Sequence, residues 1–210
     1  MNFMKRFCLV IFLSAISFAA TAREFPKNMV SVEAGYNAAW MTSYGVKASA
    51  IPAFMVGLAD QIRLTEKHPF YFETGLMFQG KGYAINGYED SRTATYHLQI
   101  PLNIKYHIYL NDLVRLEPGA GLYYAAGIGG KLSYAGTDID VFKNGILSRH
   151  DIGWSCALDC GISRFFLGVA YEMGFLKVDR KDVVYGEESG KLGYRDLRNY
   201  VFSVRIGVCF

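Results

Sequence analysis

The sequence has few cysteines, few prolines and no long apolar run outside its N-terminus. Among 210 residues there are 4 Cys and 5 Pro. Beyond the N-terminus no run of 18 apolar residues predicts a membrane-spanning helix. The three cysteines that follow the N-terminal segment, Cys156, Cys160 and Cys209, are odd in number and fit no zinc pattern. We therefore expect these cysteines to form neither a metal site nor a disulfide, and we expect no cofactor.

The sequence also lacks an excess of either charge. It has 22 Lys and Arg against 19 Asp and Glu, and removing the two bases of the N-terminal segment leaves 20 against 19. This near-balance gives no reason to expect nucleic acid or a polyanionic substrate as a partner.

Residues 1–22 have the pattern of a secretory signal peptide. Lys5 and Arg6 form a charged start, residues 7–20 are apolar, and Ala20-Thr21-Ala22 resembles a cleavage site. A short anchor helix is the alternative, but the segment is short and ends in small residues. We expect cleavage near Ala22, which leaves residues 23–210 as one mature domain.

Residues 95–110, TYHLQIPLNIKYHIYL, alternate between apolar and polar side chains. Successive side chains of a β-strand point to opposite faces, so one face of this strand is continuously apolar and the other is polar and basic. Lipid-facing strands of outer-membrane barrels need about 9–11 residues with such a face and aromatic residues at the interfaces. We interpret this stretch as one strand of a transmembrane β-barrel.

Seven more stretches alternate in the same way, which predicts an all-β fold: an eight-stranded antiparallel up-and-down transmembrane β-barrel. Because proline cannot donate a ladder hydrogen bond, we expect local bulges at Pro101 and Pro118, and Asp60 marks either a bulge or the membrane edge. The predicted strands are 30–40, 49–64, 70–82, 95–110, 114–129, 150–162, 165–178 and 197–210.

The connections after the first, third, fifth and seventh strands are long, and the others are short. Outer-membrane barrels have short periplasmic turns and long extracellular loops, which places both termini in the periplasm and the protein in the cell outer membrane. The chain ends at Phe210, and an aromatic C-terminal residue resembles the signal that the barrel-assembly machinery reads. We expect outer-membrane lipid and that machinery as partners, and a protein partner at the long loops.

An eight-stranded barrel has an interior just wide enough for side chains. Six acidic and five basic residues are predicted to face inward, and we expect them to pair, because unpaired buried charges are costly. A narrow polar pore or ligand site is the alternative to this filled lumen. The predicted inward residues are Glu33, Glu73, Glu117, Asp151, Asp159, Glu172, Arg63, Lys81, Lys105, Arg115, Arg205, His97, His107, Gln99, Asn37 and Asn103.

Two stretches resemble the PorT-like outer-membrane β-barrel family, which is common in the Bacteroidetes. Residues 96–106, YHLQIPLNIKY, are similar to its Y-L-x-I-P-L-x-L-K-Y stretch, and residues 74–82, TGLMFQGKG, to its G-L-x-Y-x-x-K-G. Residues 151–153 and 200–202 also fit the family. The resemblance covers the whole mature chain and implies an eight-stranded barrel of the OmpA class. Some members are accessory parts of a protein secretion system, and no residue here indicates that role.

Three functions fit this sequence. The first is a non-enzymatic structural or interaction barrel that acts through its loops. The second is a lipid-modifying enzyme, which needs a serine and a histidine near the lipid interface; Ser43, Ser148 and His150 are near predicted loop ends, but no G-x-S-x-G motif is present. The third is a soluble lipocalin-like barrel with an apolar interior. We expect the first, and we assign no catalytic, cofactor-binding or metal-binding residue.

Overall fold

The computed structural model describes residues 26–42, 48–85, 91–134, 136–179 and 197–210. The predicted signal peptide lies outside these residues. Among them no helix is long and apolar enough to cross a membrane. Eight long strands and three short ones make up the described part of the chain. They are β1 (Asn28–Thr42), β2 (Ala48–Ser49), β3 (Ile51–Arg63), β4 (Phe70–Ile85), β5 (Arg92–Tyr106), β6 (Ile108–Tyr109), β7 (Val114–Tyr134), β8 (Thr137–Asp140), β9 (His150–Ile162), β10 (Phe165–Gly174) and β11 (Arg198–Cys209).

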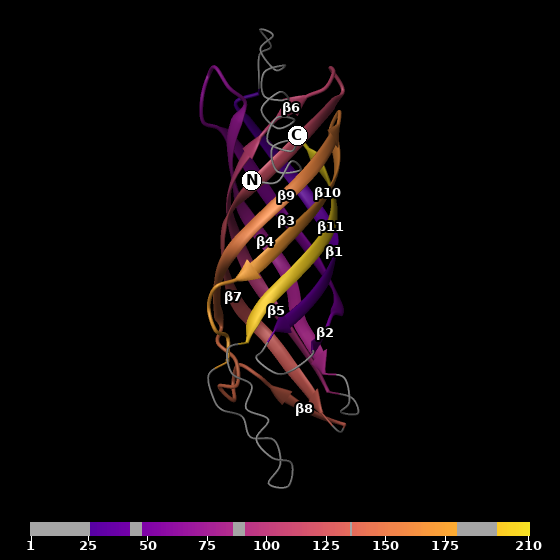
Figure 1. Cartoon of the computed structure of the whole chain (residues 1–210), viewed down its shortest axis with the longest axis vertical. Coiled ribbons are helices and arrows are strands. Elements are labelled where there is room, and N and C mark those ends of the chain that lie inside the picture. Colours follow the sequence, from indigo (N-terminus) through magenta and orange to yellow (C-terminus); the bar gives the residue numbers. More distant parts are fainter. Residues whose placement is uncertain (1–25, 43–47, 86–90, 135, 180–196) are drawn as a thin grey trace, which may run out of the picture.

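The eight long strands form a closed antiparallel barrel. Each pairs with two neighbours, in the order β1–β3–β4–β5–β7–β9–β10–β11, and β11 returns to β1. Figure 1 shows the strands tilted around one long cylinder, with β6 and the C-terminus at one end and β8 at the other. We call these the turn end and the loop end. The predicted eight-stranded barrel is thus confirmed.

The alternation of the sequence sets the two faces of the wall. Along β5 every second residue from Thr93 to Lys105 is buried, and the residues between them are exposed or half-buried. The exposed side chains are large and apolar, as Leu98, Ile100 and Leu102 show. The interior is polar and charged, so the lipocalin-like alternative, with its apolar interior, is wrong.

Aromatic side chains form a girdle around the loop end of the outer face. Trp40 stacks on Tyr200 with ring centroids 5.7 Å apart, and Phe78 stacks on Tyr96 at 5.7 Å. At the turn end Phe70 packs against Tyr106, with ring centroids 4.7 Å apart. Aromatic rings flanking an apolar band are the pattern of transmembrane barrels. The loop-end girdle consists of Trp40, Tyr200, Tyr171, Trp154, Phe54, Phe78, Tyr96, Tyr124 and His150.

The expected bulges at the two prolines are wrong. Pro101 pairs with Tyr123 and Pro118 pairs with Leu158 in unbroken register. Pairing between β4 and β5 is interrupted opposite Pro101, but the register on both sides of the gap is the same. Proline has no backbone N–H, so each proline removes one hydrogen bond between strands. A bulge needs an extra residue in one strand, and the loss of a hydrogen bond does not require one. Asp60 likewise lies in unbroken register, so it marks no bulge.

The register shift lies elsewhere, in β7. Tyr96 pairs with Gly129 and His97 with Gly127, which leaves Ile128 as an extra residue. Before this bulge the odd-numbered residues of β7 face inward, and after it the even-numbered Gly130 and Leu132 are buried. The bulge lets β7 continue to Tyr134, beyond the predicted end at residue 129.

Other boundaries also differ from the prediction, most of them by one to three residues, and the larger differences are as follows. The strand predicted to reach residue 110 ends at Tyr106, and β6 follows it after His107. The strand predicted to reach residue 178 ends at Gly174. The predicted loop 130–149 contains the hairpin of β7 and β8, in which Ser133 pairs with Asp138. Most of the predicted loop 179–196 lies outside the described residues.

Candidate functional site

The lumen holds two groups of charged side chains, and the first lies toward the turn end. Lys105 contacts Glu73, and its Nζ lies 2.8 Å from Asp159 Oδ2 and 3.8 Å from Glu117 Oε2. Arg205 binds Asp159 with two nitrogens, at 3.0 and 2.7 Å, and donates a third hydrogen bond of 3.3 Å to Glu33. We call this the turn-side cluster: Glu33, Glu73, Lys105, Glu117, Asp159 and Arg205.

Arg115 closes the turn-side cluster at the end of the barrel. Its Nε donates to Glu117, and its Nη1 donates to the Ser163 carbonyl at 2.8 Å. Its Nη2 lies 3.5 Å from Cys209 Sγ. Arg63, also predicted to face inward, is half-buried at the end of β3.

The second group lies toward the loop end and surrounds Lys81. Lys81 Nζ is 3.2 Å from Asp151 Oδ2 and 3.7 Å from Glu172 Oε2, and it lies 4.2 Å from the centre of the Tyr123 ring. Tyr123 donates a hydrogen bond of 3.1 Å to Asp151, and Asn199 donates another at 2.8 Å. We call Lys81, Asp151 and Glu172 the loop-side cluster.

Neutral amides supply the donors that the bases do not. Gln79 and Gln99 donate to the two oxygens of Glu172 at 3.2 and 2.7 Å, and Asn103 donates to Glu73 at 3.0 Å. Buried charges are tolerated when such partners satisfy them. The predicted paired network is therefore present. The prediction omitted Gln61 and Asn199 from its list, although both continue the inward alternation of their strands.

Glycines on the inner wall make room for these long side chains. Gly168 is paired with both Asp159 and Arg205. A Cβ at Gly168 would lie 1.8 Å from Asp159 Oδ1, and one at Gly119 would lie 2.7 Å from Lys105 Cγ. A larger residue at either position would displace a member of the turn-side cluster.

The space left inside the lumen is small. A cavity of about 30 Å³ lies between the two clusters, and its polar lining consists of Glu33, Gln79, Gln99, Asn103, Ser155, Glu172, Ser203 and Arg205. A cavity needs roughly 10–15 Å³ to hold one water molecule. The lumen therefore has space for about two water-sized particles at this level.

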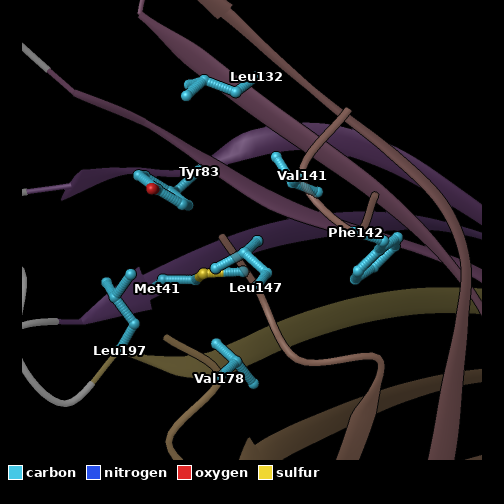
Figure 2. Packing of buried hydrophobic residues seen from close by; sticks show 8 residues of the cluster. All are labelled: Met41, Tyr83, Leu132, Val141, Phe142, Leu147, Val178 and Leu197. Carbon is cyan, nitrogen blue, oxygen red and sulfur yellow. The ribbon is translucent and has the colours of Figure 1, made fainter. Parts of the chain in front are cut away.

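Apolar side chains close the loop end above the charged lumen. Phe142 stands edge-on to His97, with ring centroids 6.0 Å apart, and the Arg149 guanidinium lies 5.0 Å from the centre of the Phe142 ring. Figure 2 shows eight side chains gathered from the ends of β1, β4 and β7, from the connection after β8, and from the segments that follow β10 and precede β11. We call them the loop-end cap: Met41, Tyr83, Leu132, Val141, Phe142, Leu147, Val178 and Leu197.

The connection after β8 folds back over the mouth because its backbone is anchored. The Asp140 carboxylate accepts hydrogen bonds from the Phe142 and Lys143 amides at 3.0 and 2.9 Å. The Leu147 amide donates to the Val141 carbonyl at 3.1 Å. Hydrogen bonds from the backbone amides of Lys143 and Phe142 hold the pKa of Asp140 below its usual value, so the turn keeps its charged acceptor under more acidic conditions than an ordinary Asp would.

The cap was missed because residues 130–149 were predicted to be one long loop, rich in charge, Gly and Tyr and suited to adaptable contact. The available signal was the apolar content of Val141, Phe142, Ile146 and Leu147, which is unusual for a solvated connection. Three of them are buried, so this part of the connection is packed and does not offer an adaptable surface.

We expect Phe142→Ala to loosen the cap while the barrel remains folded. Truncating a buried Phe costs about 3–5 kcal/mol, and here the loss falls on the connection that Phe142 anchors. Limited proteolysis of the protein in detergent should show faster cutting between residues 136 and 149. Lys143→Ala, an exposed neighbour in the same turn, is the control and should leave the cutting rate unchanged. Equal rates in both variants would contradict the packing role of Phe142.

The described serine and histidine of the enzymatic alternative do not form a nucleophile and base. Ser148 Oγ donates to the backbone carbonyl of His150 at 3.3 Å and accepts from its amide at 3.2 Å. The His150 ring instead bonds the Tyr124 hydroxyl through Nδ1 at 2.7 Å. Ser43 lies outside the described residues. Activation of a serine requires a base within hydrogen-bond reach of its hydroxyl, and this pair lacks that arrangement.

The cysteines and the remaining ligand types do not converge. Cys156 and Cys160 are half-buried on the outer face of β9, whereas Cys209 is buried beside Arg115. Within the described ranges no three His, Cys, Asp or Glu side chains are placed to hold a metal ion together.

Two solved structures share this fold at low sequence identity. Neisserial surface protein A (NspA) is 14% identical with a TM-score of 0.50, over 88% of this chain and 98% of NspA. The outer membrane protein OprG from Pseudomonas aeruginosa is 12% identical with a TM-score of 0.52, over 89% of this chain and 97% of OprG. At this identity the likeness establishes the barrel fold and leaves the activity open.

A third structure, the outer membrane enzyme PagL, is 11% identical with a TM-score of 0.47, over 86% of this chain and 98% of PagL. A search of curated protein sequences finds no match to this chain. A family model described as an outer membrane protein beta-barrel domain matches residues 26–180, which is most of the chain. With its closed barrel of eight long strands, this chain belongs to the outer membrane protein beta-barrel domain family.

Proposed function

We propose that this protein is a non-enzymatic barrel of the outer membrane that acts as an interaction scaffold through its long connections. The observation that carries this proposal is the double closure of the barrel, by ion pairs in the lumen and by the loop-end cap above them. A filled lumen offers no path for solute, and binding sites usually lie on loops that a rigid scaffold positions.

The proposal includes an orientation and a route. Residues 1–22 direct export and are removed near Ala22, and Phe210 engages the barrel-assembly machinery. The turn end then faces the periplasm and the loop end faces the exterior, as the lengths of the connections favour. Within the family we propose that this protein belongs to the PorT-like group, because of the two stretches at residues 74–82 and 96–106. The most specific role that this group suggests is that of an accessory part of a protein secretion system.

The enzymatic alternative has less support. The Ser148 hydroxyl bonds the backbone of His150 and not its ring, and the His150 ring is held by Tyr124. If Ser148 and His150 were catalytic, replacing them would abolish lipid modification. We propose instead that these residues shape the outer surface of the barrel at the loop-end girdle.

A closed barrel should not conduct ions. We expect the folded protein in planar bilayers to give no large, stable single-channel steps, because the ion pairs around Lys81 and Lys105 cross the lumen at two levels. Protein whose folding is confirmed by its shifted gel migration before boiling is used, and bilayers without protein serve as the control. Stable conductance steps from such protein would contradict the closed lumen.

Loss of the longest connection should abolish partner recovery without unfolding the barrel. We expect a deletion within residues 180–196 to retain the gel shift of the folded barrel and to recover no partner after crosslinking in the outer membrane. The matched control is Arg164→Ala, which lies at the opposite end of the barrel. There Tyr109, Arg115 and Arg164 line an open pocket of about 310 Å³. Full recovery by the deletion variant, with loss in Arg164→Ala, would move the contact surface to the turn end.

A further inference from the structure

Asp60 is an ionisable residue on the apolar outer face of the barrel. Its neighbours along β3, Ala59 and Gln61, are buried in the interior. Leu58 and Ile62 are exposed on the other face, to which Asp60 belongs. Because the side chains of a strand alternate between faces, the Asp60 carboxyl points outward, toward lipid. Ionisable residues are costly in such a position, and where they occur within a membrane they mark functional contacts.

The pairing of β3 with β4 fixes the depth of Asp60 in the membrane. Asp60 pairs with Thr74, which lies four residues from Phe70 and four from Phe78. Phe70 belongs to the aromatic contact at the turn end, and Phe78 to the loop-end girdle. With a rise of about 3.4 Å per residue and a tilt of about 35–45°, Thr74 is about 10 Å in depth from each of them. The tilt offsets paired residues of neighbouring strands by only about 3 Å, so Asp60 lies well inside the apolar band.

One oxygen of this carboxyl has no hydrogen-bond donor. Asp60 Oδ1 is enclosed and has no partner among the described protein atoms, so the hydroxyl of the paired Thr74 does not reach it. The side chain as a whole is half-buried, and rotation about its terminal torsion brings either oxygen to the surface of the wall. A buried acceptor without a donor costs free energy, and lipid chains supply no donor. The donor therefore has to come from another molecule.

The pair formed by Asp60 and Thr74 is complementary to itself. Asp60 offers an acceptor and Thr74 a hydroxyl donor, and both residues belong to the outer face at nearly the same depth. Two copies inserted in the same orientation carry this pair at one level. A two-fold axis along the membrane normal then places each Asp60 opposite the Thr74 of the other copy. We call the pair and its exposed apolar neighbours the Asp60 patch: Val30, Leu58, Asp60, Ile62, Thr74 and Leu76.

We propose that two copies of this chain associate in the membrane through their Asp60 patches, with Asp60 of each copy accepting a hydrogen bond from the Thr74 hydroxyl of the other. Packing and hydrogen bonds drive association in lipid, because lipid is as apolar as the surfaces that meet. A different protein that offered a lysine or arginine at this depth would itself be destabilised by that charge, whereas a threonine hydroxyl adds none. This inference does not depend on the proposed loop function.

Energy transfer between labelled copies in lipid vesicles tests the proposal. The three cysteines beyond the signal peptide are replaced by alanine, and Lys143→Cys, at an exposed position of the loop end, carries the donor or the acceptor dye. We expect energy transfer that decreases as lipid is added. Asp60→Leu and Thr74→Val should each raise the dissociation constant of the dimer about tenfold, because each removes both reciprocal hydrogen bonds. Energy transfer no higher than random mixing gives, or an unchanged dissociation constant in either variant, would overturn the proposal.

Two control variants separate this contact from general effects of the outer face. Asp60→Asn keeps a side-chain oxygen as acceptor and should retain the dimer. Leu158→Val should also retain it, because Leu158 is exposed on β9, four strands around the barrel from β3. The gel shift of the folded barrel should be present in every variant, which separates loss of association from loss of folding. Loss of the dimer in either control would overturn the assignment of the contact to the Asp60 patch.

Crosslinking in the outer membrane distinguishes a second copy from a different partner. Leu58→Cys lies in the Asp60 patch, and Leu158→Cys provides the position on the opposite side of the barrel. In the same background without other cysteines, a photoactivated crosslinker attached at Leu58→Cys should join two copies. The same crosslinker at Leu158→Cys should not. Equal amounts of dimer from both positions would contradict the proposal, as would the absence of dimer from Leu58→Cys, whether or not a different protein is captured in its place.

Discussion

Lys105→Met should destabilise the barrel more than any other single substitution in the lumen. Lys105 is the common partner of Glu73, Glu117 and Asp159, and its side chain is 2% exposed. Removing it leaves several carboxylates close together and away from water. Breaking a buried ion pair by removing one partner costs about 3–5 kcal/mol. Urea unfolding in lipid vesicles should show this loss, or the variant should fail to reach the folded form on a gel.

The matched control is Lys131→Met in the hairpin of β7 and β8. Lys131 pairs with Asp138 at 3.2 Å, but its side chain is 71% exposed. Exposed pairs contribute little to stability, so this variant should unfold like the unaltered protein. Similar unfolding midpoints for Lys105→Met and Lys131→Met would contradict the role of the turn-side cluster. Methionine keeps the apolar stem of lysine, so the comparison isolates the charge.

Leu102→Arg should cause the second large loss, from the outer face. Leu102 lies midway along β5 between Tyr96 and Tyr106, and its side chain points out of the barrel. An arginine on the lipid face near the bilayer midplane costs about 2–4 kcal/mol. Folding into vesicles, followed by urea unfolding, should measure that loss.

Leu113→Arg is the control for the same change of side chain. Leu113 is 64% exposed in the short connection at the turn end, outside the apolar band. We expect no measurable loss there, because the charge remains in water. If both arginine variants folded with the stability of the unaltered protein, the outer face would not be in contact with lipid.

Most of the barrel could be predicted from the sequence because period-two alternation reports directly on the two faces of a strand. The strand at 150–162 was predicted with the bounds that β9 has, and the six inward acids are all buried. Alternation cannot detect a bulge, since one extra residue breaks the pattern only beyond it. This is why the predicted strand ended at residue 129 and β7 continues to Tyr134.

The contents of the lumen were predicted as a set, but the pairs were not. Alternation places Lys105 inside, whereas its partners come from β4, β7 and β9, whose registers depend on the closure of the barrel. The loop-end cap could not be predicted from the alternation of apolar and polar residues, for a different reason. Val141 and Phe142 lie in a connection without periodicity, and only the folded barrel shows that the connection returns to the mouth.

The extra residue at Ile128 divides β7 into two segments: odd-numbered residues face inward in the first, and even-numbered residues face inward in the second. On the turn-end side Tyr123 faces the charged lumen, and on the loop-end side Leu132 faces the cap. Deleting Ile128 would remove the bulge and leave Gly130 and Leu132 facing inward, whereas pairing of the full-length strand without a bulge would turn Lys131 and Ser133 toward the mouth, with Leu132 directed outward. Conversely, changes in the hairpin beyond Gly129 leave the pairing of β7 with β9 untouched, because that pairing ends at Ala126. The loop end of β7 can therefore change in sequence while the pairing of β7 with β9 keeps its register.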